Sequence, residues 1–441
     1  MNKIAQKVPY AQLFLLGLCY NILALFHVLL PSWVVAIAGL IFVAIFIAKV
    51  SKFFTFPQSL LLSTIALIPS SFLSMAGTSY ANLPVSLFSL SIILLFLIIL
   101  RKRTLEPWFA VSFLFFIIFA LLSLTWVEYP LSALKQAANI GVFLLSFSIC
   151  AYFYMHESSK QFLRTCIVVY IQTAVIFAFT VILQKVFIDT TGTVIGNYGE
   201  YALGRQSYAG LMGDFSFASL YIATGVIILL FAYLQKNVKN LSTLLLGEAL
   251  LIGSLVITNA RTGLFALAAA TLVGAIAGLF KANVKAVVLS IFVGIIILVS
   301  GLGIYSNRGE QSLIDGSSRS IEYSSGIQTF VEHPLVGIGF GDENYEKYLG
   351  DNPLPHNFYI QYLMQGGIIG LSIILASFLL FLRLPLTKDK GIVLVLVAVF
   401  IGSMFVPDIF SSRYLSIIII IAFVSCGTYV ALKNEKTHVE A

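Results

Sequence analysis

The chain has 441 residues, of which 59% are hydrophobic and only 10% are charged. Soluble domains carry about 25% charged residues, so a water-soluble fold of this length is excluded. An aromatic content of 14% with only 12 prolines also excludes a disordered or low-complexity chain. The formal net charge is +7, and in a membrane protein the positions of the positive charges indicate the topology. We therefore expect a polytopic membrane protein with no nucleic-acid partner.

Apolar runs of about 17–25 residues predict the membrane-spanning helices. The expected fold is all-α, with about 14 such helices and a range of about 12–14. In chain order the predicted spans are 11–30, 32–48, 59–75, 83–100, 107–126, 138–155, 165–187, 215–234, 241–258, 262–280, 284–305, 357–382, 391–407 and 413–432. No small-residue cleavage site follows the first span, so we expect a retained signal anchor. The four cysteines lie in or beside these spans without a CxxC spacing, which predicts neither disulfides nor a zinc site.

Basic residues orient the spans. If the N-terminus is cytoplasmic, 18 of the 26 basic residues fall in cytoplasmic segments, as the positive-inside rule expects when both termini are inside. Because the rule disfavours basic residues on the other side, those that do lie there are candidates for a functional role. The eight residues at or near the outer side are Lys135, Lys185, Arg205, Arg261, Arg308, Arg319, Lys347 and Arg413.

Two outer loops are long, at 188–214 and 307–356. Such loops in a chain otherwise joined by short turns are usually either functional or disordered. Residues 318–331 predict an amphipathic surface helix within the second loop. The apolar side chains that recur there at helical spacing are Tyr323, Ile327, Phe330 and Val331.

A glycine run follows the predicted surface helix, at Gly337, Gly339 and Gly341. It is not a dinucleotide-binding fingerprint, because no βαβ unit surrounds it and it lies on the outer side. We expect a flexible turn at this position.

Arg261 is a candidate phosphate-binding residue. It stands at the start of the span 262–280 and follows Asn259, a plausible N-cap. A guanidinium at a helix N-terminus lies beside free backbone N–H groups, and its forked shape matches phosphate oxygens. The alternative is an interfacial arginine that reaches toward the membrane surface without taking part in function.

His356 is the candidate general base. Pro353 and Pro355 precede it, which predicts a position in the first turn of the span 357–382. There the helix dipole disfavours imidazolium, so we expect a neutral ring that can accept a proton. A lone histidine is usually structural or solvated, and the other four lie at span edges, before a proline or in the tail: His27, His156, His333 and His438.

Carboxylates leave alternatives open for two other arginines. Arg205 could form an ion pair with Glu200 or Asp214, and Arg319 could pair with Glu322. No acidic pair at i, i+2 spacing occurs in the chain, so we expect no metal. Within the predicted spans, Glu248 is expected to form a helix–helix hydrogen bond, and a proton relay is the alternative.

Several of these motifs resemble the signature region of the O-antigen ligase and polymerase superfamily. Tyr323 stands where many members have Trp, and Ala260 where Ser is commoner. Order, spacing and membrane side agree over about residues 200–375. The segments that carry the resemblance are Leu203-Gly204-Arg205-Gln206, Asn259-Ala260-Arg261-Thr262-Gly263, Arg319-x-x-x-Tyr323, 332–341 (EHPLVGIGFG), 355–361 (PHNFYIQ) and 366–370 (GGIIG).

This resemblance implies an enzyme that transfers a glycan from a polyprenyl (undecaprenyl) diphosphate to an acceptor sugar hydroxyl. The reaction would take place on the outer face of the bacterial cytoplasmic membrane, without a cofactor, by a metal-independent inverting displacement. The expected partners are the lipid-linked oligosaccharide donor, a lipid-linked glycan acceptor, membrane lipid, a chain-length regulator and a flippase. The implied catalytic residues are His356, Arg261 and Arg205, and the implied substrate contacts are Arg319, Asn357, Tyr323 and Asp214.

Two alternatives to a polysaccharide polymerase remain. A ligase would transfer the glycan to a different lipid or wall acceptor. A flippase would belong to another class of protein, but the chain lacks an evident internal repeat and its polar groups gather in the outer loops. We expect three regions: N-terminal transmembrane helices (1–187), a catalytic membrane region (188–382), and C-terminal transmembrane helices with a cytoplasmic tail (383–441).

Overall fold

The computed structural model describes residues 8–75, 86–101, 107–156, 159–201, 205–235, 240–280, 291, 293–295, 297–299, 301–302, 317–349, 354–388, 390–411 and 413–440. Its α-helices are α1 (Tyr10–Leu25), α2 (Ser32–Val50), α3 (Phe56–Ala66), α4 (Leu87–Arg101), α5 (Pro107–Ser123), α6 (Pro130–His156), α7 (Lys160–Thr191), α8 (Phe215–Leu234), α9 (Leu241–Ile257), α10 (Thr262–Phe280), α12 (Ser317–Glu332), α13 (Asp342–Leu349), α14 (Phe358–Lys388), α15 (Lys390–Gly402) and α16 (Arg413–Glu440). The short 3-10 helices are η1 (Ile68–Ser70), η4 (Ser403–Phe405) and η5 (Ile409–Ser411), and the strands are β1 (Tyr198–Tyr201) and β2 (Arg205–Tyr208).

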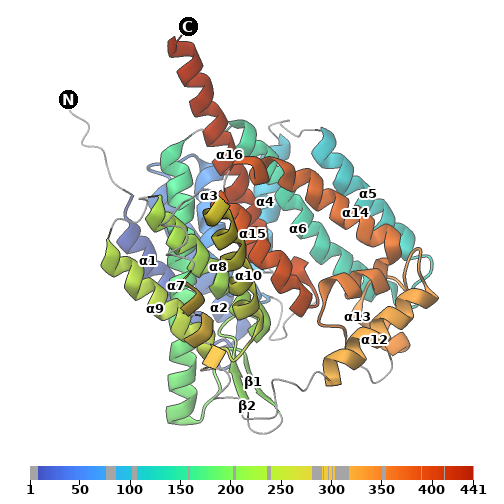
Figure 1. Ribbon diagram of the computed structural model, residues 1–441. Helices are drawn as coiled ribbons and strands as arrows, with labels where there is room; N and C mark the ends of the chain where they lie inside the picture. Colours follow the sequence, from blue (N-terminus) through green and yellow to red (C-terminus); the bar gives the residue numbers. More distant parts are fainter. Residues whose placement is uncertain are drawn as a thin grey trace, which may run out of the picture.

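The helices form a bundle with two distinct ends (Figure 1). The β1–β2 hairpin, α12 and α13 lie at one end, called here the hairpin end, and α16 projects from the other. Among the described residues, 5 helices are long and apolar enough to cross a membrane, and shorter apolar helices accompany them. The chain is therefore a multi-pass, almost wholly helical membrane protein, as the sequence predicts, whereas the count of about 14 spans stays a prediction.

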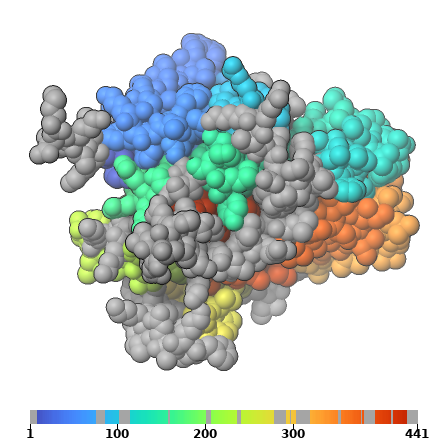
Figure 2. Space-filling view, turned by 90° about the horizontal axis from the view of Figure 1, so that it is seen from above, coloured from blue at the N-terminus to red at the C-terminus, as the bar shows by residue number. Residues whose placement is uncertain are grey.

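Two helices form the core of the bundle. Most residues of α8 are buried, and α8 packs against α7, α9, α10 and α15. The isoleucine run 417–421 of α16 is also buried, and α16 packs along α6. A helix that is apolar on every face is buried on every face. Seen from the end opposite the hairpin, the first helices (blue) lie on one side, and the α5–α6 region lies beside α14 on another (Figure 2).

The start of α10 lies directly on α8. A Cβ at Gly263 would come within 2.4 Å of the Ser219 carbonyl oxygen, so only glycine permits this approach. The Gly263 N–H donates to Ser219 Oγ at 3.1 Å. Close helix contacts in membranes depend on small residues of this kind. This contact fixes the position of Arg261, two residues before Gly263.

The hairpin lies within the predicted outer loop 188–214 and contains the only strands among the described residues. Tyr198 pairs with Tyr208, and Tyr201 with Arg205. The buried Gln184 on α7 ties the strands to the bundle, because its side chain donates to the Ile195 carbonyl at 2.7 Å and accepts from the Gly210 N–H at 2.9 Å. The described residues of this loop are therefore structured.

Helix α14 is broken at Gly367, where φ is 59° and ψ is −166°. The break leaves the N–H groups of the next two residues without their usual helical acceptors. They donate instead to the preceding chain segment: Ile368 to the Pro334 carbonyl at 2.9 Å and Ile369 to the Leu335 carbonyl at 3.1 Å. Beyond the break, residues 368–388 would extend about 31 Å, enough to cross the bilayer core without the first part of α14.

The glycine run completes this arrangement from the other side of the break. Ile338 N–H donates to the Met364 carbonyl at 3.0 Å, and Gly339 N–H donates to the Gln365 carbonyl at 2.9 Å. These carbonyls are the ones that the break in α14 leaves free. We call the four hydrogen bonds between 334–339 and 364–369 the splice. The prediction of a flexible turn at the glycines is therefore wrong, because this segment is hydrogen-bonded into α14 on both sides of its break.

Gly367→Ala should destabilise the protein more than Gly366→Ala, its neighbour in sequence. An alanine at position 367 would adopt a conformation that is open essentially only to glycine, and its Cβ would lie 2.3 Å from the Leu335 carbonyl oxygen. The nearest atom to a Cβ at Gly366 is 3.7 Å away. Strain of this kind costs about 1–3 kcal/mol. We expect a lower melting temperature in detergent for Gly367→Ala only, and equal melting of the two variants would contradict the splice.

Candidate active site

Segments that are far apart in sequence meet at the hairpin end. The Asn259 side chain donates to the Gln206 carbonyl at 3.0 Å, which joins the turn before α10 to β2. The Tyr323 hydroxyl lies 3.2 Å from the Met404 carbonyl and 3.4 Å from the His356 carbonyl, so α12 is held against both η4 and the turn before α14. The two long loops predicted from the sequence thus contribute to one cluster.

His356 is paired with Glu322 on α12. The imidazole Nδ1 lies 3.1 Å from Glu322 Oε2, and the His356 backbone N–H donates to the same oxygen at 3.2 Å. Glu322 is buried, whereas the His356 side chain is 42% exposed. Because a carboxylate only accepts hydrogen bonds, Nδ1 carries the proton in the neutral ring, and Nε2 remains as the proton acceptor.

The structure corrects the predicted location of His356. Helix α14 begins at Phe358, and its N-cap is Asn357, whose side-chain oxygen accepts from the N–H groups of Tyr359 at 3.0 Å and Ile360 at 3.3 Å. His356 therefore precedes the helix rather than lying in its first turn. The helix dipole does not determine the charge of its ring.

The electrostatic prediction for His356 is also wrong in direction. The hydrogen bond to the Glu322 carboxylate raises the pKa of His356 above its usual value of 6.5, although burial opposes this. The charge of Asp214 adds to the increase, and that of Arg319 reduces it. Burial raises the pKa of Asp214 itself, against the hydrogen bond from the Ser216 N–H and the nearby imidazole. The imidazole is therefore a stronger base than the sequence implies.

Arg261 lies at the N-terminus of α10, as predicted, but Asn259 is not the N-cap of this helix. The Phe265 N–H donates to the Arg261 carbonyl at 3.0 Å, which makes Arg261 the first residue of the helical hydrogen-bond pattern. Asn259 adopts a left-handed conformation with φ 57°, and its side chain holds the hairpin. Burial lowers the pKa of Arg261, and the charge of Arg319 lowers it further. The Arg261 guanidinium nevertheless remains charged, because arginine is effectively always protonated in proteins.

Arg319 contacts an aromatic stack rather than Glu322. Its guanidinium lies 5.7 Å from the centre of the Phe405 ring, and Phe405 stacks on Phe265 with 5.1 Å between ring centres. A cation over a ring face is stabilised by about 0.5–2 kcal/mol, depending on exposure. The stack joins α12, η4 and α10, so it places Arg319 and Arg261 on the same side of the cluster.

The remaining predicted residues have structural partners. Tyr323 holds α12 to η4, and Asn357 caps α14. Asp214 is the N-cap of α8, where its side chain accepts from the Ser216 N–H at 2.6 Å. Arg205 lies in β2, one residue before the carbonyl that accepts from Asn259. The backbone of Arg205 is thus close to the Arg261 motif.

Sequence reasoning missed two parts of this cluster. Glu322 was considered only as a local partner of Arg319, three residues before it, whereas its actual partner lies 34 residues away. Phe405 lies near the end of the predicted span 391–407, where an aromatic side chain gave no signal of a role. Glu322 could have been noticed as an acidic residue on the predicted amphipathic helix close to the arginine.

A second polar cluster lies nearby and is structural. The buried Arg413 donates to the Phe410 carbonyl at 3.2 Å and also contacts Asn139. Asp408 accepts from the Tyr362 hydroxyl at 3.2 Å and the Phe410 N–H at 3.0 Å. These contacts connect α6, α14 and α16. Arg413, predicted as an outer basic residue, is therefore occupied in holding helices together.

Two further expectations from the sequence concern Glu248 and metal binding. Glu248 on α9 is buried, and neither carboxyl oxygen has a hydrogen-bond partner among the described residues, so the expected helix–helix hydrogen bond is not found. No group of three or more His, Cys, Asp or Glu residues able to hold a metal occurs in the described part of the chain.

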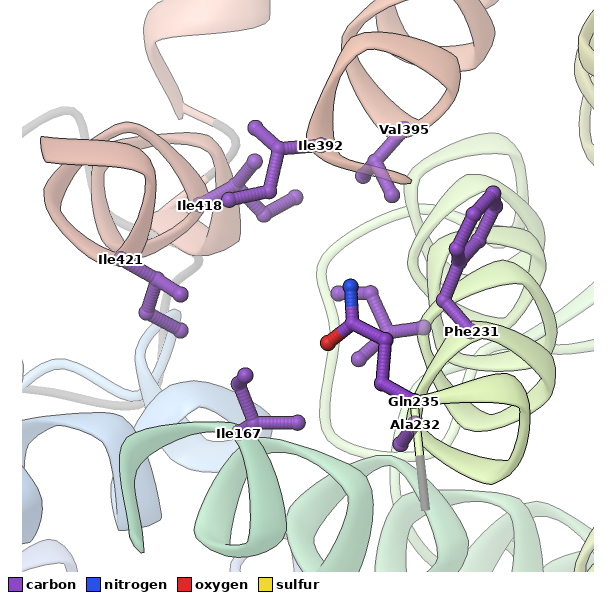
Figure 3. Close-up of a pocket in the computed structure, with 9 residues that line it drawn as sticks. Ile167, Phe231, Ala232, Gln235, Ile392, Val395, Ile418 and Ile421 are labelled. Atoms are coloured by element: carbon purple, nitrogen blue, oxygen red, sulfur yellow. The ribbon is translucent and has the colours of Figure 1, made fainter. Parts of the chain in front are cut away.

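An apolar cavity lies between α7, α8, α15 and α16 (Figure 3). It is close to the end of α8 and the start of α15, whereas the cluster around His356 lies at their opposite ends. Its lining offers no titratable group, so it is not the site of proton transfer. The lining residues are Ile167, Ile228, Phe231, Ala232, Gln235, Ile392, Val395, Ile418 and Ile421.

Glu322→Gln should lower the pKa of His356. The substitution keeps the shape of the side chain but removes the charge that stabilises imidazolium. Diethylpyrocarbonate modifies the neutral ring, so peptide mass spectrometry can follow modification of His356 against pH. We expect a midpoint above about 6.5 in the unsubstituted protein and a lower midpoint in the variant. Asp214→Asn should give a smaller shift in the same direction, and an unchanged midpoint in Glu322→Gln would rule out the pair.

Residues 246–375 match the family described as O-antigen ligase. The matched region contains Arg261, α12, the splice and His356, whereas Arg205, Asp214 and Phe405 lie outside it. A comparison with curated proteins found no match. The match is confined to residues 246–375 of the 441, and it agrees with the resemblance of the sequence motifs to the O-antigen ligase and polymerase superfamily.

Proposed function

We propose that the protein transfers a glycan from a polyprenyl diphosphate to the hydroxyl of an acceptor sugar and so polymerises a surface polysaccharide. The donor would be an undecaprenyl diphosphate carrying an O-antigen or capsule-type repeat unit. The hairpin end would face the outside of the bacterial cytoplasmic membrane, and both termini would lie in the cytoplasm. The family match supports this class of reaction.

The observation that carries the proposal is the pairing of His356 with Glu322 beside two arginines. Such a cluster holds a base next to a positively charged region. Group transfer from a diphosphate needs both, because the acceptor hydroxyl must lose a proton and the leaving group must carry negative charge. The cluster is formed by residues at the hairpin ends of several helices, where a lipid-linked substrate can present its head group.

In the proposed reaction, the acceptor hydroxyl oxygen attacks the anomeric carbon of the donor. Its proton moves to Nε2 of His356, and the developing imidazolium is stabilised by Glu322 and Asp214. The bond between the anomeric carbon and the diphosphate oxygen breaks, and the diphosphate leaves with the electron pair. Attack from the face opposite the leaving group inverts the anomeric configuration. Arg261 balances the charge of the leaving group, and no metal or cofactor takes part in the proposed steps.

The roles of the other predicted residues follow from their positions. Arg319 lies close enough to Arg261 to lower its pKa, so both arginines would bind the diphosphate. We keep Arg205 as a third contact, since its backbone adjoins the Arg261 motif. Tyr323 and Asn357 would position the base through α12 and the cap of α14 rather than by direct contact with the glycan.

The domain assignment remains part of the proposal. Residues 188–382 would form the catalytic membrane region, and 1–187 and 383–441 would support it. One part of the observed cluster fits this division poorly, because η4, which contains Phe405, belongs to the C-terminal region. A chain-length regulator and a flippase would act with the protein, together with membrane lipid and the lipid-linked acceptor.

A ligase is the second candidate function, because the matched family is described as O-antigen ligase. The two reactions share donor, base and leaving group and differ only in the acceptor. In proteoliposomes with lipid-linked donor alone, a polymerase forms a ladder of longer lipid-linked glycans. A ligase forms product only when a different acceptor lipid is added.

Arg261→Ala should abolish turnover of the lipid-linked donor, and Arg261→Lys should retain only part of it. Lysine keeps the charge but loses the fork that binds two phosphate oxygens. Turnover is measured in proteoliposomes at equal protein content. Arg164→Ala is the matched control and should retain turnover. Arg164 lies near the start of α7, whereas the hairpin follows the end of α7. Unsubstituted activity in Arg261→Ala would return this arginine to an interfacial role.

His356→Ala should turn over donor at least about 100-fold more slowly, the usual effect of removing a general base. In the unsubstituted enzyme the rate should fall as pH drops through the raised pKa of His356, because protonation removes the base. Glu322→Gln should move this fall to lower pH. A chelator should have no effect on the rate. Near-normal turnover in His356→Ala, or inhibition by the chelator, would contradict the mechanism.

A further inference from the structure

The second half of α12 exposes aliphatic side chains. Ile327 is 48% exposed and Val331 is 66% exposed, although the spacing of apolar residues predicts an amphipathic helix that buries them. The buried face of α12 carries Glu322 and Thr329 instead. The usual arrangement of an amphipathic surface helix is thus partly reversed, because two polar side chains are packed against the protein while aliphatic residues face outward.

This apolar surface continues beyond the helix. Leu335 and Val336 in the following turn are 64% and 37% exposed. Through the splice, the Leu335 carbonyl accepts from Ile369, and Ile368 and Ile369 are themselves 53% and 44% exposed. Those two isoleucines begin the part of α14 that is long enough to cross the bilayer. The exposed surface of α12 is therefore continuous with the lipid-facing surface of a membrane-spanning helix.

Aromatic residues mark the level of this surface in the membrane. A Cβ at Gly339 would meet the Val127 side chain at 2.0 Å and Trp126 Nε1 at 3.6 Å, so the splice packs against the turn between α5 and α6. Trp126 and Tyr129 in that turn are 37% and 42% exposed. Tryptophan and tyrosine are enriched where the hydrocarbon core meets the head groups.

Polar residues occupy the neighbouring edge of the same half-helix. Gln328 Nε2 donates to Glu332 Oε1 at 3.2 Å, and both side chains are exposed. In an α-helix, consecutive residues are separated by about 100° around the axis. Ile327 and Val331 therefore face one direction, and Gln328 and Glu332 face another. A helix with these two edges fits the boundary between lipid and water.

We infer that the second half of α12 and the turn after it rest in the lipid bilayer at the hairpin end, with Ile327, Val331 and Leu335 among the acyl chains. The partner is the lipid surface itself rather than another protein, because the exposed aliphatic residues of α12 and the following turn are joined through the splice to the exposed Ile368 and Ile369 at the start of the crossing part of α14. The inference stands apart from the proposed reaction, since it needs only the membrane. It would also set the depth of Glu322, which lies on the opposite face of the same helix.

Spin labels at adjacent positions test this inference. Single cysteines are introduced at Ile327 and Val331, with Gln328 and Glu332 as matched water-side controls. All four variants also carry Cys19→Ala, so that the label reacts only at the introduced cysteine. Cys19 is exposed, whereas the other three native cysteines are buried. The proteins are reconstituted in phosphatidylcholine vesicles. Collisions with oxygen, which concentrates in lipid, are compared with collisions with a water-soluble nickel chelate.

We expect labels at 327 and 331 to collide several-fold more with oxygen than with the chelate, and labels at 328 and 332 to show the reverse. Equal access of the chelate to all four positions would place α12 in water and overturn the inference. Low collision rates with both reagents at 327 and 331 would overturn it as well, because a second copy of the chain or another protein would then cover the surface. Circular dichroism of each variant checks that the helical content is retained.

Discussion

The four backbone hydrogen bonds of the splice hold the hairpin end of the molecule together. A helix broken inside a membrane protein must satisfy the peptide groups that the break releases. Here they are satisfied by the chain that leaves α12, so the break in α14 and the path of α12 determine each other. Arg319 fixes the other end of α12 by its contact with Phe405. These two attachments orient α12 so that Glu322 faces His356.

The charged groups around His356 influence one another's protonation. Glu322 and Asp214 both raise the pKa of the imidazole, and the charge of Arg319 lowers the pKa of Arg261. Like charges held close together cost free energy, which a bound phosphate would offset. In the proposed function, the groups that bind the diphosphate would therefore also affect the protonation of His356. Substitution of one of these charged residues would therefore change the protonation of the others as well as its own hydrogen bonds.

Local patterns were enough to predict some features of this protein and not others. Hydropathy and spacing predicted the membrane class, the extent of α12 and the place of Arg261 at a helix start, because each depends on residues within a few turns. The contact between Glu322 and His356 depends on how α12 returns to α14, which no local pattern contains. The break at Gly367 was missed because two adjacent glycines in an apolar run suit a continuous helix as well as a broken one. The hairpin was missed because its strands have only four residues each.

The splice also restricts the length of the chain. Two hydrogen bonds use the carbonyls of Pro334 and Leu335, and two use the N–H groups of Ile338 and Gly339, so only two residues separate the paired sets. An insertion or deletion between them would displace one pair relative to the broken helix and leave peptide groups unsatisfied. Residues before α12 carry no such requirement from the splice. Length variation in this loop should therefore be confined to one side of α12, while the segment from Pro334 to Gly339 keeps a constant number of residues.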